Sequence, residues 1–278
     1  LPRMRALAGL STEEAEELAL PDLLDLPPAV APLARQSVLA AMAQRIPTRA
    51  GGPATPEQAW LLAGELARLF DEIALEEADV AMLEREPPER FAEVWLARLD
   101  GLVPEKHATH WQITTTVLRA VATDWNDWLK DRGLLDIGVR RVKALAAQAA
   151  AWQRDPPAEM TVAAGIGAGG TIPAAAELLR VLAAAPQGHV VLQGLPEPVD
   201  DALWEAIRVA PTHPLAGQAR LLKALGAVPA DLTPWHDDVP ATAPRDRAVL
   251  LGRALHPAEG LSSWTERDPA RWRDAARG

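Results

Sequence analysis

Three closely spaced glycines are the feature of this sequence best suited to chemistry. In the stretch TVAAGIGAGGTIPAAAELL, residues 161–179, they fit the pattern G-x-G-x-x-G. Between a strand and a helix, such glycines let the backbone approach the pyrophosphate of a dinucleotide at the helix N-terminus. On this interpretation, the residues that would hold a nicotinamide or flavin cofactor are Gly165, Gly167, Gly170 and Thr171.

The residues that normally complete a nucleotide site are missing around this loop. A dinucleotide site needs an acidic residue at the end of the next strand, but that strand is expected to end at Leu195, and Glu197 lies beyond a proline. A P-loop needs a lysine before its Ser or Thr, yet Thr171 follows Gly170 directly. The sequence therefore favours a tight strand-to-helix crossing, in which glycine permits close backbone approach, over a working cofactor site.

No other group of residues predicts a catalytic or metal site. The chain has no cysteine, which excludes disulfides, thiolate ligands and a cysteine nucleophile. His107 and His110 share one face of an expected helix, but no suitably spaced third ligand accompanies them. Neither G-x-S-x-G nor a recognisable triad order is found among the serines and histidines. We therefore assign no catalytic residue and no metal ligand.

The overall charge argues against a protein that holds nucleic acid mainly by electrostatics. The formal net charge is −10 at pH 7, whereas contacts to phosphates need cationic side chains. DNA contact would therefore come from a local basic strip. Within the body of the chain, the one short strip of this kind consists of Arg140, Arg141 and Lys143.

Ten tryptophans, with no tyrosine and two phenylalanines, raise the separate hypothesis of base stacking. Three of them lie among apolar residues at helical spacing, which predicts core positions: Trp60, Trp111 and Trp125. Those in polar, loop-like surroundings are Trp235, Trp264 and Trp272. For these last three, we favour packing against neighbouring domains over stacking on DNA.

Residues 1–155 have the pattern of a helical subdomain. The sequence Thr55-Pro-Glu-Gln58 is typical of a helix start, with Thr as N-cap and Pro in the first turn. The apolar residues that follow it at helical spacing are Leu62, Leu66, Leu69 and Ile73. Further helices are expected over 106–132, with Gly133 as a stop, and over 137–153.

Beyond residue 155 the pattern changes to strand, helix, strand. Residues 160–164 and 189–195 are short buried-strand candidates joined by a helix over 172–185, which predicts a parallel β-α-β unit. Helices are also expected over 199–209 and 214–226. The predicted fold class is therefore α/β and mainly helical.

The predicted organisation has three parts: a helical subdomain over 1–155, a partial parallel-sheet subdomain over 156–235, and a connecting segment over 236–278. The longest uncharged run, 160–176, is too short for a comfortable membrane span. The lack of cysteine fits a reducing cytoplasm, which we take as the expected location. Because the chain begins at Leu1 rather than Met, we expect it to be a piece of a longer protein.

Several blocks of the sequence carry a resemblance in their order rather than in any catalytic signature. They are HWQITTTVLRAVATDWNDWLKDRGLLD, the glycine stretch with its continuation through DDALWEAI, HPLAGQARLLKALG, and ALHPAEGLSSW. Together they span nearly the whole chain and resemble the helicase-like part of the AddB-type subunit of bacterial double-strand-break-repair helicase–nucleases. The resemblance implies that residues 156–235 form a degenerate P-loop-NTPase-like subdomain of the superfamily-one helicase kind.

The resemblance also implies that the motor chemistry has been lost. In active superfamily-one helicases, a strand ends in Asp-Glu, which hold magnesium and activate water. Here the corresponding strand ends Ala163-Ala164-Gly165, and no carboxylate occurs between Glu159 and Glu177. A Walker-B function needs a carboxylate within reach of the metal. The expected state is an inactive Walker motif.

Partners and cofactors follow from the same resemblance. It implies an AddA-type partner subunit that supplies ATP hydrolysis, and DNA as a ligand. It places the family's magnesium, ATP and 4Fe-4S cluster outside this chain, and it adds Arg3 and Arg5 as DNA-contact candidates, because related helicases meet DNA there. The expected function is a non-catalytic, DNA-contacting scaffold in recombinational repair. An enzyme using the Gly165–Gly170 loop and a helical protein-interaction module remain open alternatives.

Overall fold

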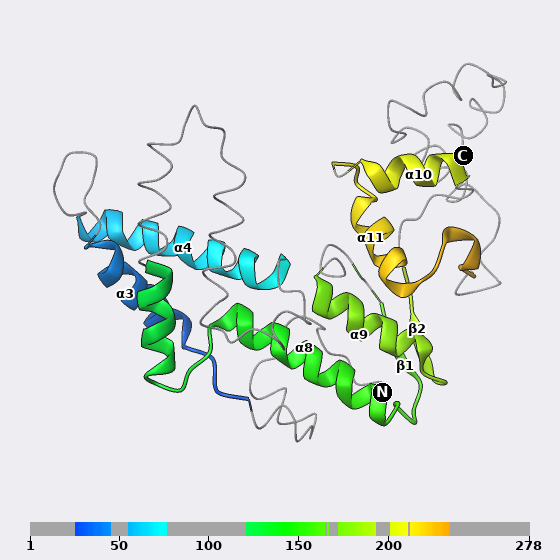
Figure 1. The fold of residues 1–278 in the computed structure, drawn as a ribbon, viewed down its shortest axis with the longest axis horizontal. Helices are drawn as coiled ribbons and strands as arrows, with labels where there is room; N and C mark the ends of the chain where they lie inside the picture. Colours follow the sequence, from blue (N-terminus) through cyan, green and yellow to red (C-terminus); the bar gives the residue numbers. More distant parts are fainter. Residues whose placement is uncertain are drawn as a thin grey trace, which may run out of the picture. The chain divides into compact units, whose positions relative to one another are not determined.

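The fold is mainly helical with a small two-stranded parallel sheet (Figure 1). The computed structural model describes residues 26–45, 55–76, 121–164, 166, 172–192, 201–210 and 212–233. The chain divides into two compact units, Leu1–Ala151 and Trp152–Gly278. The predicted subdomain boundaries at residues 155 and 235 stay predictions.

In the first unit, α3 (Pro32–Ala43) and α4 (Pro56–Glu76) pack against each other. A further helix covers 121–130, and α8 (Ile137–Arg154) follows it. The start of α4 confirms the predicted cap. The backbone N–H of Gln58 donates to Oγ1 of Thr55 at 3.3 Å, and the backbone N–H of Thr55 donates to Oε1 of Gln58 at 3.1 Å. This reciprocal pair satisfies two donors that the helix leaves open.

The apolar face of α4 differs from the predicted one at its start. Leu66 and Ile73 are buried, as expected for the stripe, but Leu62 is 38% exposed. Trp60 is 39% exposed, so its predicted core position is wrong. The first turns of α4 bury Ala59 and Ala63 instead. Small side chains there allow close contact with α3 and leave the bulky ones at the flank.

Trp125 is confirmed as a core residue, with 2% of its surface exposed. It lies on the helix over 121–130 and belongs to the same apolar cluster as Leu39 and Leu66. The predicted stop of this helix is also confirmed. Gly133 has φ 60°, and the N–H of Leu134 donates to the carbonyl of Leu129 at 3.0 Å. Glycine suits this left-handed position because it has no Cβ. The part of the predicted helix before residue 121, including Trp111, lies outside the described residues.

The second unit confirms the predicted β-α-β arrangement. Its elements are β1 (Thr161–Ala163), α9 (Pro173–Ala184) and β2 (Gly188–Val190), and the strands are parallel with Thr161 opposite Gly188. Helix α9 packs on β2. The turn between them is so tight that a Cβ on Gly188 would lie 1.8 Å from the carbonyl oxygen of Leu182. A residue without a side chain is therefore required at this position.

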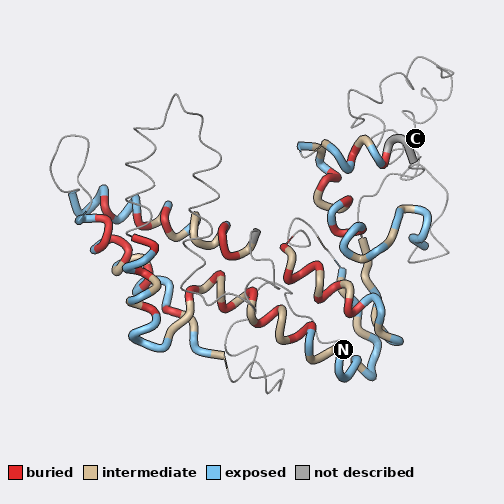
Figure 2. The backbone as a smooth tube through the Cα atoms, in the orientation of Figure 1, coloured by how far each residue is buried: buried red, intermediate tan, exposed pale blue. Residues whose placement is uncertain are grey.

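Burial of the two strands is lower than predicted. Val162 of β1 and its partner His189 of β2 are both exposed, whereas their neighbours along each strand are half-buried (Figure 2). Successive side chains of a strand point to opposite faces. One face of this sheet is therefore open, and the expectation of fully buried strands is wrong.

Two helices complete the described part of this unit. They are α10 (Asp201–Val209) and α11 (Ala216–Leu225), followed by a 3₁₀ turn, η3 (Pro229–Asp231). Both helices were predicted, and α11 packs on α9 and α10. Their core cluster is Trp204, Ile207, Leu215, Ala219 and Leu222. Among the described helices, none combines the length and apolar character needed to cross a membrane.

Candidate functional site

The glycine crossing lies where ligand sites of parallel sheets are built, at the carboxyl end of a strand. Strand β1 ends at Ala163, and α9 begins at Pro173 with Ile172 as an N-cap that makes no side-chain hydrogen bond. The cofactor candidates of the loop, Gly165, Gly167, Gly170 and Thr171, lie outside the described residues and stay predictions.

The described residues around this crossing are neutral. Ala163 ends β1 and Ala164 follows it, and Val191 and Leu192 follow β2, so none of these described residues carries a carboxylate. Nowhere in the described ranges do three His, Asp or Glu side chains gather in a way that could hold a metal ion. His107 and His110 lie outside those ranges. A Walker-type magnesium site would need a carboxylate, and the described residues at this edge of the sheet include none.

The three cations of the basic strip on α8 differ in how far they are exposed to solvent. Arg140 is only 6% exposed, and its Nε donates to the carbonyl of Pro27 at 3.2 Å. A buried guanidinium held by backbone is not available to a phosphate. This finding weighs against Arg140 as a DNA contact and makes it a structural residue.

The other basic residues stay predicted DNA contacts. Arg141 and Lys143 are partly exposed. Within the described part of the chain, Nε of Arg141 is buried without a hydrogen-bond acceptor. Arg3 and Arg5 lie outside the described residues, as do Trp235, Trp264 and Trp272.

Sequence reasoning missed a partly buried ion-pair cluster that joins four segments of the first unit. We call Arg35, Asp71, Trp125 and Asp136 the Arg35 node. Arg35, 4% exposed, places Nη2 2.8 Å from Oδ1 of Asp136 and donates from Nε to Oδ2 at 3.2 Å. Its Nη1 donates to Oδ2 of Asp71 at 3.0 Å. Its Nη2 also donates to the carbonyl of Ala67 at 3.1 Å.

Asp136 is the acceptor on which the node converges. The indole N–H of Trp125 donates to Oδ2 of Asp136 at 2.7 Å, and the backbone N–H of Gly138 donates to Oδ1 at 3.3 Å. Asp136 therefore acts as the N-cap of α8. Burial raises the pKa of Asp136 above its ordinary value, while the charge of Arg35 and the Trp125 hydrogen bond oppose that rise. The negative charge of Asp71 adds to the rise.

Because the side chains of the node bind one another and the backbone, we interpret the node as structural. It ties α3 and α4 to the helix over 121–130 and to the start of α8. Two signals in the sequence could have indicated it. Arg35 is an isolated cation in an apolar helix, and Asp136 directly precedes a helix start.

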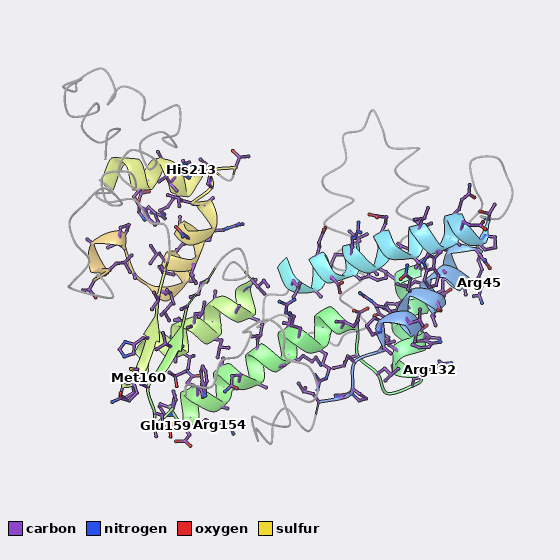
Figure 3. The ribbon with its side chains drawn as sticks, turned by 180° about the vertical axis from the view of Figure 1, so that it is seen from behind. Arg45, Arg132, Arg154, Glu159, Met160 and His213 are labelled. Carbon is purple, nitrogen blue, oxygen red and sulfur yellow. The ribbon has the colours of Figure 1, made fainter. Side chains whose placement is uncertain are left out.

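An aromatic stack extends from the node toward the surface. The rings of Trp125 and Trp128 stack with centroids 5.3 Å apart and planes 9° apart. The guanidinium carbon of Arg132 lies 4.2 Å from the centroid of the Trp128 ring. Arg132 is exposed and lies just past the end of the helix over 121–130 (Figure 3).

Comparisons of the chain with models of known protein families, with curated proteins and with solved structures find no match.

Proposed function

We propose that this chain is a non-catalytic, helicase-like scaffold that contacts DNA within an AddB-type subunit of a double-strand-break-repair helicase–nuclease. ATP hydrolysis belongs to an AddA-type partner subunit, and nuclease activity belongs to a domain outside this chain. The resemblance in block order named above supports the family, and the fold of the second unit is compatible with it.

One observation carries the non-catalytic part of the proposal. The second unit has the strand–crossing–helix–strand topology on which phosphate-binding sites are built, yet the described carboxyl ends of β1 and β2 carry only Ala163, Ala164, Val191 and Leu192. Metal-assisted phosphoryl transfer needs carboxylates that hold the ion and a cation that stabilises the developing charge. The described residues at this edge of the sheet supply neither.

The first experiment tests the absence of a motor site. The purified chain is incubated with Mg²⁺ and ATP, with and without single-stranded DNA, and released phosphate is measured. We expect no turnover above the buffer. Robust turnover that depends on the chain would contradict the proposal. Titration with NAD and FAD tests the enzyme alternative. Micromolar binding that is lost in Gly167→Asp would favour a cofactor-dependent enzyme.

The second experiment tests DNA contact through α8. The double variant Arg141→Glu with Lys143→Glu should weaken binding to single-stranded or forked DNA. Two lost phosphate contacts lower the slope of log affinity against log salt by about 1.4 for a single strand. The matched control is Arg68→Glu with Arg208→Glu, which changes the charge equally at two cations paired locally with Glu65 and Glu205.

The control pair should bind DNA as the wild type does, apart from a small nonspecific loss. If both double variants lose the same affinity, then overall charge rather than the α8 strip governs binding. If the wild-type chain shows no salt-sensitive DNA binding, a helical protein-interaction module becomes the better interpretation.

A further inference from the structure

The stack of Trp125, Trp128 and Arg132 ends in a planar cation at the surface. Its inner ring, Trp125, is fully embedded and hydrogen-bonded to Asp136, which Arg35 holds in place. The middle ring, Trp128, is half-buried and packs against the apolar core of the first unit. Rings in nearly parallel planes form a stack whose inner end is fixed by the fold.

Arg132 is held on this stack from two directions. Its guanidinium carbon lies over the Trp128 ring at 4.2 Å, and its Nη1 donates to the backbone carbonyl of Trp128 at 3.2 Å. A guanidinium held by a ring on one side and by a hydrogen bond at its edge has lost much of its rotamer freedom. A ligand that stacks on it therefore meets a largely preorganised plane.

The charges beside this plane identify the part of a nucleic acid that it suits. The helix over 121–130 carries the exposed residues Asp127 and Lys130, and the exposed Asp131 directly follows it. Oδ2 of Asp124 lies 3.9 Å from Nη1 of the exposed Arg45. This surface does not have the uniform positive charge that tracks a phosphate backbone. Nucleobases, by contrast, stack on aromatic rings and on arginine planes without needing a basic field.

We propose that Arg132, supported from beneath by Trp128, is a stacking platform for one unpaired base of single-stranded DNA. The proposal rests on the DNA-contacting function proposed above and adds a base contact to the phosphate contacts expected on α8. It assigns the recognition to the flat face of the guanidinium rather than to its charge.

The test separates the flat face from the charge. Arg132→Lys keeps the charge and removes the plane, and Arg132→Ala removes both. Each variant of the full chain is titrated with an oligothymidylate and with an abasic strand of the same length. Arg68→Lys is the matched control, because Arg68 is an exposed arginine on another helix of the same unit that pairs with Glu65 three residues before it. Thermal unfolding of each variant checks that the fold is kept.

We expect Arg132→Lys to bind the oligothymidylate about fivefold to tenfold more weakly than the wild type. It should bind the abasic strand as the wild type does, and Arg68→Lys should match the wild type on both strands. Equal affinity of Arg132→Lys and wild type for the oligothymidylate would overturn the platform and leave the DNA-contacting function standing. An equal loss on both strands would likewise overturn it, because a base contact cannot weaken binding to a strand without bases. A wild-type chain that binds neither strand would overturn both proposals.

Discussion

The two units of this chain hold their helices together by different means. In the first unit, the Arg35 node places a guanidinium and a carboxylate in the interior, both less than a tenth exposed. In the described part of the second unit, the buried side chains are apolar, and the ion pairs Glu177–Arg180 and Glu205–Arg208 are partly exposed pairs within single helices. The first unit thus combines an apolar core with buried polar contacts, whereas the described interior of the second unit is apolar.

The sequence separation of the joined elements accounts for this difference. Arg35 and Asp136 are 101 residues apart, so the node must select one arrangement among segments that no short connection restrains. Elements β1, α9 and β2 follow one another along the chain, and their ladder and tight turn already fix their positions. A buried ion pair adds little net stability but strongly penalises arrangements that leave a charge unpaired.

The largest effect that would test this comparison is expected for Asp136→Ala. This change leaves the guanidinium of Arg35 buried with one of its two carboxylates missing and removes the cap of α8. We expect the first unit to lose about 3–5 kcal/mol of unfolding free energy, measured by urea denaturation. Asp124→Ala, which removes an exposed carboxylate 3.9 Å from Arg45, should change it by less than about 0.5 kcal/mol. Similar losses of unfolding free energy in the two variants would show that the Arg35 node stabilises the first unit no more than an exposed ion pair does.

A smaller effect in the second unit should come from geometry rather than from charge. In Gly188→Ala, the new Cβ meets the Leu182 carbonyl oxygen at 1.8 Å, so the turn between α9 and β2 must shift. We expect a loss of about 1–3 kcal/mol in urea denaturation. The matched control is Gly64→Ala in α4, where the nearest atom lies 3.7 Å from the new Cβ. That control should stabilise by about 0.5–1 kcal/mol. A neutral Gly188→Ala would contradict the described turn.

Local signals in the sequence predicted most of the described elements. The cap formed by Thr55 and Gln58, the stop at Gly133 and the β-α-β order each depend on neighbouring residues, which the sequence displays directly. Interactions of this kind need no knowledge of what lies across the core.

The parts that could not be predicted depend on which face of a helix meets a distant segment. Trp60 was expected in the core because it lies among apolar residues, but the close contact between α3 and α4 selects the small residues instead. Arg140 was grouped with Arg141 by sequence, yet its side chain binds the carbonyl of Pro27, 113 residues away. The Arg35 node likewise joins segments whose proximity no local pattern reveals.

The smallest expected effect is on the pH dependence of stability, because each unit carries a carboxyl group whose pKa is shifted and the two pKa shifts are opposite. Burial raises the pKa of Asp136, so the folded chain binds its proton more tightly than the unfolded chain does. Stability from this group is present below the ordinary Asp value and is lost as pH rises through the raised pKa. Hydrogen bonds from Arg180 lower the pKa of Glu177, so stability from that group is present above the ordinary Glu value and is lost as pH falls.

Asp136→Asn and Glu177→Gln should therefore change the pH dependence of stability in opposite directions. The stability lost in Asp136→Asn should be larger near pH 4 than near pH 7. The wild type loses the contribution of its protonated carboxyl as pH rises, whereas the amide of the variant does not titrate. The stability lost in Glu177→Gln should be larger near pH 7 than near pH 3, because the favourable pairing with Arg180 is present only while the carboxylate is ionised. Urea denaturation of each variant and of the wild type at those pH values gives the differences. If both differences run in the same direction, the contrast between a desolvated carboxyl in the first unit and a paired, half-exposed one in the second does not hold.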